Sequence, residues 1–229
     1  AYIMKFNFID IDKSVLPTAK GKRQGKYRFY NIGDINYPSV TSVLGVRKKV
    51  ELQQWRDRIG ENVANWEMGR AARRGTATHN LIENYIKGEP LTEKSVLPLG
   101  LFKLMKPYVD QIQNIHCLET VLYSKKYRLA GQVDCIAEYN GKLSVIDFKT
   151  ANKERKEEWI ENYFLQCTAY ALMYEELYGK EIEKVVLIIG GEDGSMATYV
   201  KDKKDYIKRL EEVLEDFYKM FELEYGEPK

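Results

Sequence analysis

Two aspartates lie in a stretch whose sequence predicts a tight β-hairpin, GQVDCIAEYNGKLSVIDFK at 131–149. Asn140-Gly141 separates two β-rich runs, and this dipeptide is typical of a two-residue type I′ turn. Counting back from the turn one residue at a time brings Asp134 opposite Asp147, with their Cβ atoms roughly 4.5–5.5 Å apart on one face. Two facing carboxylates of this kind are suited to holding a divalent cation.

A divalent cation would relieve the repulsion between these carboxylates. Like charges directly opposite each other destabilise a sheet, and Mg²⁺ is typically held by one or two carboxylates together with phosphate oxygens. Strand alternation places Lys149 on the same face as Asp147. An aspartate at a strand end is more often solvated, but the apolar neighbours Val145, Ile146 and Phe148 make this one costly to bury without a partner. The pattern therefore predicts a metal site for phosphate chemistry.

Length and composition predict one globular domain. The 229 residues, 44% of them hydrophobic, are enough for one sizeable core. The sequence contains no run of about 18 apolar residues, so no transmembrane helix is predicted. The first residues lack the basic, then apolar, then small-residue order of a signal peptide. The chain has only three cysteines, Cys117, Cys135 and Cys167, and this number excludes a fully paired disulfide framework and a four-cysteine cluster within the chain.

The net charge of +2 hides an uneven distribution. Residues 1–80 carry 15 Lys and Arg against 7 Asp and Glu, whereas residues 81–229 carry 21 against 27. Basic groups concentrate at 20–28, 47–49 and 70–74. Such clusters can contact nucleic acid. The alternative is a set of solvated loops, and the sequence does not say whether the clusters lie beside the predicted metal site.

Periodicity and glycine placement predict an α/β arrangement, with a mixed central β-sheet flanked by helices and an N-terminal helical region. The expected strands are 2–11, 26–32, 117–124, 131–139, 142–149, 183–190 and 196–201. The expected helices are a short one within 36–45, two or three between 51 and 87, and then 99–114, 155–179 and 202–224. Gly60, Gly69 and Gly75 would divide the second of these regions, and Thr76 or Thr78 would cap its last helix.

Further polar groups lie among apolar residues of the predicted helices. His79 precedes Glu83 by one turn, although a lone helical histidine is more often packed or exposed than a ligand, and the second histidine of a zinc-protease helix is missing. Gln166 and Tyr170 share one face of the helix that follows Lys149. An amide in apolar surroundings needs hydrogen-bond partners, so this pair could hold the lysine or a DNA phosphate. Neither a nucleotide P-loop nor a serine-nucleophile elbow is present.

The order of these motifs, RGTATH…GQVD…VIDFK…QCTAY, resembles the RecB-like branch of the PD-(D/E)XK nuclease superfamily. The spacing of the two aspartates, the D-x-K and the Q-x-x-x-Y all match. Upstream, YPSVTSVL and LQQWRDRIG resemble the mitochondrial genome maintenance exonucleases and their phage and bacterial relatives. The likeness covers roughly 37–175, with Val133 in place of the motif's proline. It implies a single nuclease domain at 1–229, with N-terminal strands and a basic helical region at 1–90 and a restriction-endonuclease-like core at 91–229.

The resemblance also implies roles for individual residues. The positions that bind Mg²⁺ or Mn²⁺ correspond to His79, Asp134, Asp147 and the backbone carbonyl of Phe148. The catalytic positions correspond to Lys149, Asp134, Asp147, Gln166 and Tyr170. Because the nearby carboxylates favour a charged lysine, we expect Lys149 to orient water and stabilise charge rather than to act as a base. The four cysteines of the iron–sulfur site in some relatives are missing, so we expect no iron–sulfur cluster.

The basic helical region is the expected contact surface for the substrate. The segment 47–74 could form a wall or arch over single-stranded DNA, with basic groups along the phosphates and a tryptophan stacked on bases. The alternative is that Trp55 and Trp66 belong to the core. The expected DNA contacts are Trp55, Arg56, Arg70, Arg73, Arg74 and Thr76.

Taken together, the resemblance implies a metal-dependent DNA exonuclease acting on single strands or DNA ends, in replication, recombination or repair. The alternatives are a structure-specific endonuclease and a DNA-binding module whose nuclease site is inactive. The expected partners are DNA and other replication or recombination proteins, with no membrane, and we expect a monomer. The expected setting is the cytoplasm of a bacterium or a phage-infected host, with mitochondria as the alternative.

Overall fold

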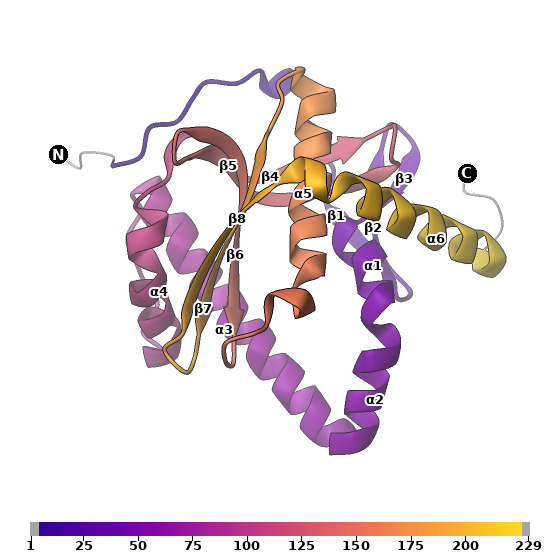
Figure 1. Cartoon of the computed structure of the whole chain (residues 1–229), viewed down its shortest axis with the longest axis horizontal. Coiled ribbons are helices and arrows are strands. Elements are labelled where there is room, and N and C mark those ends of the chain that lie inside the picture. The colour runs from indigo at the N-terminus through magenta and orange to yellow at the C-terminus, as the bar shows by residue number, and fades with distance from the viewer. Residues whose placement is uncertain (1–4, 226–229) are drawn as a thin grey trace.

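The chain folds around a five-stranded mixed β-sheet (Figure 1). The computed structural model describes residues 5–225. In sheet order the strands are β4 (Gln113–Ser124), β5 (Leu129–Tyr139), β6 (Lys142–Ala151), β7 (Lys184–Gly191) and β8 (Met196–Asp202). β6 and β7 run parallel, and the other neighbouring strands run antiparallel. The predicted α/β fold with a mixed central sheet is confirmed.

Helices cover both faces of this sheet. The helices are α1 (Val40–Gly45), α2 (Lys49–Ile59), α3 (Glu61–Lys87), α4 (Val96–Val109), α5 (Glu161–Tyr178) and α6 (Ile207–Tyr225). In β7, Val185 and Leu187 pack in a core with α5 and α6, whereas Val186 and Ile188 pack in a second core with α3 and α4. Burial on both faces explains the unbroken apolar run of this strand. Within residues 5–225, no helix has the length and apolar character that crossing a membrane requires.

A small three-stranded sheet precedes α1. Its strands are β1 (Gly21–Gln24), β2 (Tyr27–Ile32) and β3 (Ile35–Pro38). The side chain of Ser39 caps α1 by accepting a hydrogen bond from the Ser42 backbone N–H. A single bridge between Ser39 and Ala130 joins this region to β5. The predicted strand at 26–32 and the short helix after it are confirmed, whereas the flanking strands β1 and β3 were not predicted.

A glycine separates α2 from α3, but two other glycines do not interrupt α3. Gly60 has φ 92° and ψ 149°, a conformation that essentially only glycine adopts. Gly69 and Gly75 lie inside α3, so the predicted caps at Thr76 or Thr78 are wrong. An isolated glycine costs a helix only about 1 kcal/mol, and the packing of α3 on α4 and β6 outweighs that cost.

Several predicted boundaries also differ from the structure. The strand predicted at 2–11 is wrong for residues 5–11, which form one bridge, between Phe8 and Ile115; the rest, 1–4, lies outside the described residues. Three helices differ at their ends: α4 spans 96–109, α5 begins at 161 and α6 begins at 207. Short 3₁₀ turns precede α5 and α6, and periodicity alone does not separate such turns from the helix that follows.

The hairpin forms with the predicted turn and register. Asn140 and Gly141 have φ values of 52° and 76°, as a type I′ turn requires. The β5–β6 ladder runs from the turn to the pair Cys135–Ile146. The ladder therefore ends one residue before the two aspartates, where the strands are free to diverge around a site.

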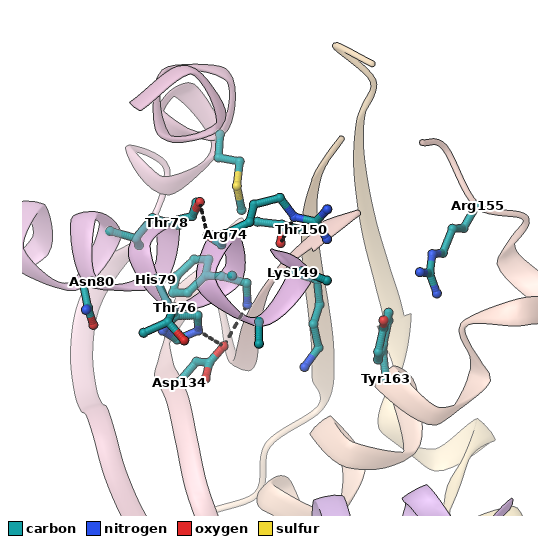
Figure 2. A pocket seen from close by; sticks show the side chains of 16 residues that line it. Arg74, Thr76, Thr78, His79, Asn80, Asp134, Lys149, Thr150, Arg155 and Tyr163 are labelled. Carbon is teal, nitrogen blue, oxygen red and sulfur yellow. Dashed lines mark hydrogen bonds and ion pairs between the residues drawn. The ribbon is translucent and has the colours of Figure 1, made fainter. Parts of the chain in front are cut away.

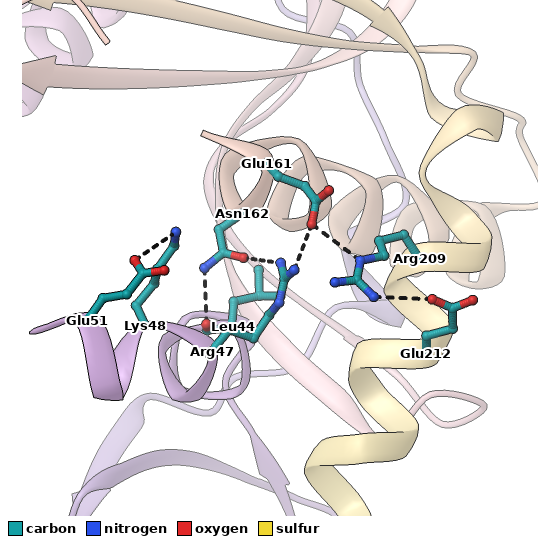
Figure 3. A network of polar contacts seen from close by, with 8 residues as sticks. All are labelled: Leu44, Arg47, Lys48, Glu51, Glu161, Asn162, Arg209 and Glu212. Carbon is teal, nitrogen blue, oxygen red and sulfur yellow. Dashed lines mark hydrogen bonds and ion pairs between the residues drawn. The ribbon is translucent and has the colours of Figure 1, made fainter. Parts of the chain in front are cut away.

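A polar network holds the beginning of α5 against α1 and α6 (Figure 3). Arg47 donates to Asn162 Oδ1 at 2.5 Å and to Glu161 Oε1 at 2.7 Å. Asn162 in turn donates to the carbonyl of Leu44, and Arg209 of α6 donates to the same Glu161 oxygen. An acidic residue in the first turn also suits the helix dipole. These contacts fix the helix that carries the Q-x-x-x-Y pair.

Gly131 of β5 leaves room for the buried ring of Tyr170, which suggests a stability test. A Cβ at Gly131 would lie 2.9 Å from both Cε1 and Oη of that ring. We expect Gly131→Ala to lower the free energy of unfolding by about 1–3 kcal/mol, because the filled core must shift. Gly100→Ala on α4 meets no atom within 4 Å and is the matched control. Denaturant unfolding measures both, and equal stabilities of the two variants would contradict the close contact.

Candidate active site

An open cleft of about 560 Å³ lies beside the end of β6 and the middle of α3 (Figure 2). Its polar lining includes Arg74, Thr76, His79, Asp134, Lys149 and Thr150. Across from α3, the side chains of Arg155 and Tyr163 complete the lining (Figure 2). The fold thus gathers at one cleft residues that lie far apart along the chain.

The two predicted aspartates lie at this end of the hairpin in different surroundings. Asp134 Oδ2 accepts a hydrogen bond from the Phe148 backbone N–H at 2.9 Å and contacts His79 Nε2 at 2.8 Å. Although burial alone would raise the pKa of Asp134, the contact with His79 lowers it. Asp147 is fully buried, and burial together with the charge of Asp134 raises its pKa to about 8. A second ionised carboxyl is therefore costly here unless a cation joins the site.

Lys149 is the cationic partner of Asp147. Its Nζ lies 3.0 Å from Asp147 Oδ2, donates to Gln166 Oε1 at 3.1 Å and stands 4.9 Å from the centre of the Tyr163 ring. Burial lowers the pKa of Lys149, but the charges of Asp147 and Asp134 outweigh burial and raise it overall. A lysine held protonated in this way is suited to orienting groups and stabilising negative charge.

The Q-x-x-x-Y pair lies behind this lysine. Gln166 is 8% exposed and uses its amide oxygen on Lys149, as the sequence predicted for a polar group among apolar neighbours. Tyr170 is buried beside Gly131, and burial raises the pKa of its hydroxyl. Gln166 therefore contacts Lys149 directly, whereas Tyr170 supports the packing behind it.

Sequence reasoning missed Glu119. Its Oε1 lies 3.1 Å from His79 Nδ1, and ligand atoms of His79, Glu119 and Asp134 all lie within 4.8 Å of one another. Burial would lower the pKa of His79, but hydrogen bonds to Asp134 and Glu119 raise it to about 11. Glu119 also has φ 47°, which is uncommon for a residue other than glycine. The available signal was an acidic residue inside the strand predicted just before the hairpin.

The residues present fit a divalent cation. Carboxylates are the ligands that suit Mg²⁺ and Mn²⁺, and Asp134 presents one in a close cluster with His79 and Glu119. In addition, Asp147 Oδ2 is buried and accepts no hydrogen bond, since Lys149 lies within ion-pair distance but outside hydrogen-bond geometry. A buried carboxylate oxygen without a hydrogen bond is what a bound cation would satisfy.

The predicted DNA contacts fall into two groups. Arg56 pairs with Glu61. Arg70 pairs with Glu192, and Arg74, 6% exposed, donates to Thr150, Asn152 and Glu192. In contrast, Arg73 and Thr76 are exposed, and Trp55 is half-buried. Arg74 therefore ties α3 to the ends of β6 and β7, whereas Arg73 and Thr76 present their side chains to solvent.

The fold and the site define a nuclease of the PD-(D/E)XK class, in which a hairpin carries the acidic residues and the D-x-K lysine. A family model described as the PD-(D/E)XK nuclease superfamily matches residues 46–224, and the chain belongs to this superfamily. The match to the family model includes the second half of the basic N-terminal region as well as the core.

Three curated relatives share one name, Mitochondrial genome maintenance exonuclease 1. The Homo sapiens protein is 27% identical over 176 residues, the Mus musculus protein 28% over 175 and the Xenopus tropicalis protein 28% over 180, each alignment covering 70% of this chain. The chain spans about half the length of these relatives, 51%, 51% and 50%. The solved chain of SSO0001 aligns with 40% of this chain, and 41% of its own length, at 23% identity and a TM-score of 0.30, a likeness too slight to bear on the fold.

The raised pKa of Asp147 gives a test of the site without metal. The unfolded carboxyl titrates near 3.8 and the folded one near 8, so the folded state favours the protonated form. Stability is then fullest below about pH 4 and falls as the pH rises through 8. In chelator, we expect Asp147→Asn to reduce this loss and to be more stable than the parent at pH 8. Denaturant unfolding at pH 5 and pH 8 measures the difference.

The exposed Asp193, whose pKa is lowered rather than raised, provides the control for that experiment. Asp193→Asn should not gain stability at pH 8. A parent protein that is equally stable at both pH values, or an Asp147→Asn variant that gains nothing, would contradict the assignment of a strained carboxyl pair.

Proposed function

We propose that this chain is a metal-dependent DNA exonuclease that acts on single strands or on DNA ends. Two observations carry the proposal: the buried Asp147 oxygen without a hydrogen bond, which lies beside Lys149, and the cluster of His79, Glu119 and Asp134. Membership of a nuclease superfamily and the name of the curated relatives support the proposal. Their name also contains the word mitochondrial, so a mitochondrial setting stands beside the cytoplasmic one expected from the sequence.

In the proposed mechanism His79, Asp134, Asp147 and the carbonyl of Phe148 would hold Mg²⁺ or Mn²⁺. When bound, the cation would polarise a phosphodiester and lower the pKa of a water molecule. Lys149 is held by its ion pair with Asp147 and by its hydrogen bond to Gln166, and its remaining N–H groups can orient the attacking water or a phosphate oxygen. Its charge stabilises the negative charge that develops on the phosphate oxygens.

The opposite wall of the cleft supplies the proposed contacts to the substrate. Arg155 is exposed there and makes no ion pair among residues 5–225. The ring of Tyr163 lies beside Lys149 and borders the same space (Figure 2). An arginine and an aromatic ring on one wall suit a phosphate and a base of a single strand. We therefore assign the substrate strand to the space between α3 and this wall.

One assay separates the proposed exonuclease from its alternatives. We expect linear single-stranded DNA to be degraded with Mg²⁺ or Mn²⁺ and left intact in chelator, and circular single-stranded DNA to survive both conditions. Lys149→Ala and Asp147→Ala should abolish hydrolysis, because the first removes the positive charge beside the phosphate and the second removes a ligand of the cation, while DNA binding measured in chelator persists.

The other outcomes of this assay identify the alternatives. Cutting of circular DNA would replace the exonuclease with an endonuclease. No cutting of either form would indicate a DNA-binding module with an inactive site. Full activity of Lys149→Ala or Asp147→Ala would show that the site has been placed wrongly.

Arg73 and Arg74, neighbours on α3, give a matched test of the proposed DNA contacts. We expect Arg73→Ala to weaken binding of single-stranded DNA and to reduce its salt dependence by about one unit of slope, because one phosphate contact is lost. Arg74→Ala should mainly lower stability, since Arg74 is buried against Thr150 and Glu192. Fluorescence anisotropy over a range of salt concentrations in chelator, and thermal unfolding, measure the two effects.

The control for this pair is Lys208→Ala on α6, an exposed cation on an element that does not line the cleft. It should leave both DNA binding and its salt slope unchanged. Wild-type binding by Arg73→Ala would remove Arg73 from the proposed contact surface.

A further inference from the structure

Glu119 lies in β4 at a position where the backbone departs from regular strand geometry. The antiparallel register pairs Leu118 with Cys135 and Thr120 with Val133, which leaves Glu119 opposite Asp134 without a regular pairing of its own. Its φ of 47° lies in the left-handed region that bulky residues seldom occupy. Local distortions of a strand next to a site re-aim a side chain. Here the distortion brings the Glu119 carboxylate against the imidazole of His79.

Both oxygens of this carboxylate lie against polar groups of the protein. Oε1 lies 3.1 Å from His79 Nδ1, and Oε2 accepts a hydrogen bond of 2.8 Å from Gln132 Nε2. The other ring nitrogen, His79 Nε2, faces Asp134 Oδ2 at 2.8 Å. The imidazole therefore bridges Glu119 and Asp134, with one nitrogen directed at each carboxylate.

We propose that Glu119 is a positioning residue that accepts the Nδ1 proton of His79 and so leaves Nε2 directed at the cation beside Asp134. This inference rests on the proposed metal-dependent nuclease site. A metal-binding histidine commonly donates its second N–H to a carboxylate, which fixes its tautomer and ring orientation. Gln132 holds Oε2 and thereby keeps Oε1 turned towards His79.

Direct binding of the cation by Glu119 is the competing assignment, and one substitution separates the two. In Glu119→Gln the amide oxygen still accepts a proton from His79 Nδ1, and the exposed Gln132 can turn its own amide to match. The charge that a direct ligand would contribute is lost. Glutamine should therefore preserve cation binding if Glu119 positions His79, but not if Glu119 is itself a ligand of the cation.

The first measurement is binding of Mn²⁺ alone, followed by the electron paramagnetic resonance signal of the free ion. We expect Glu119→Ala to weaken Mn²⁺ binding about 10–100-fold, the usual effect of removing such a partner, and Glu119→Gln to stay within a few fold of the parent. Glu138→Ala is the matched control, because Glu138 lies on β5 and holds Asn114 rather than His79. Asp134→Ala tests the metal site itself.

The second measurement uses the fact that the chain has only two histidines, His79 and His116. Long-range ¹H–¹⁵N spectra of protein labelled at histidine nitrogens follow both rings during a Mg²⁺ titration, with His116 as the internal reference. We expect Mg²⁺ to leave Nδ1 of His79 protonated and Nε2 unprotonated. At a Mg²⁺ concentration that converts the parent protein to its metal-bound spectrum, the Glu119→Ala variant should still give the metal-free spectrum.

Each other result overturns a specific statement. If Glu119→Ala binds Mn²⁺ like the parent, or if Nδ1 rather than Nε2 loses its proton, Glu119 does not position His79. If Glu119→Gln is as weak as Glu119→Ala, the carboxylate binds the cation directly. If Asp134→Ala also binds normally, the metal site of the proposed function is wrong, whereas a defect in Asp134→Ala alone removes only the role of Glu119. Thermal unfolding confirms that each variant is folded.

Discussion

The close approach of two carboxylates at the end of one hairpin, one of them buried, is the constraint on which the rest of the site depends. Asp134 and Asp147 stand where the β5–β6 ladder stops, and the second of them is fully buried. Burial, together with the charge of Asp134, raises the pKa of Asp147. The protein offsets the repulsion between the two carboxylates from two directions, with Lys149 beside Asp147 and His79 against Asp134. A cation bound at this site, as proposed, would relieve the repulsion and so couple cation binding to stability.

The surrounding elements are arranged so that these partners stay in place. The network of Arg47, Glu161, Asn162 and Arg209 fixes the start of α5, from which Gln166 reaches Lys149. On the other side, Arg74 and Arg70 join α3 to Glu192 at the end of β7, which keeps His79 over the hairpin. The basic residues whose clustering in the sequence suggests a nucleic-acid surface thus fall into two groups. Some form ion pairs that join elements of the fold, and others, such as Arg73, are exposed.

Local signals predicted most of the elements, and the errors have local causes. The Asn140-Gly141 turn and the register after it follow from backbone preferences within a few residues, and both are present. The glycines inside α3 were weighted as breaks, but tertiary packing against α4 and β6 overrides an isolated glycine. The short strands β1 and β3 carry little periodicity of their own and are stabilised by pairing with β2. Helix starts shifted because 3₁₀ turns precede α5 and α6.

The sequence by itself determined the hairpin, the facing aspartates, the lysine two residues beyond and the polar pair on the following helix. Those features depend on strand and helix periods, which act over short distances along the chain. Only the tertiary structure decided that Glu119 meets His79, that Arg74 is buried against Glu192 and that Arg155 faces the cleft. Each of these depends on which side chain from a distant segment approaches, and packing of the whole fold sets that choice. The left-handed backbone at Glu119 is likewise a product of strand packing that no local preference predicts.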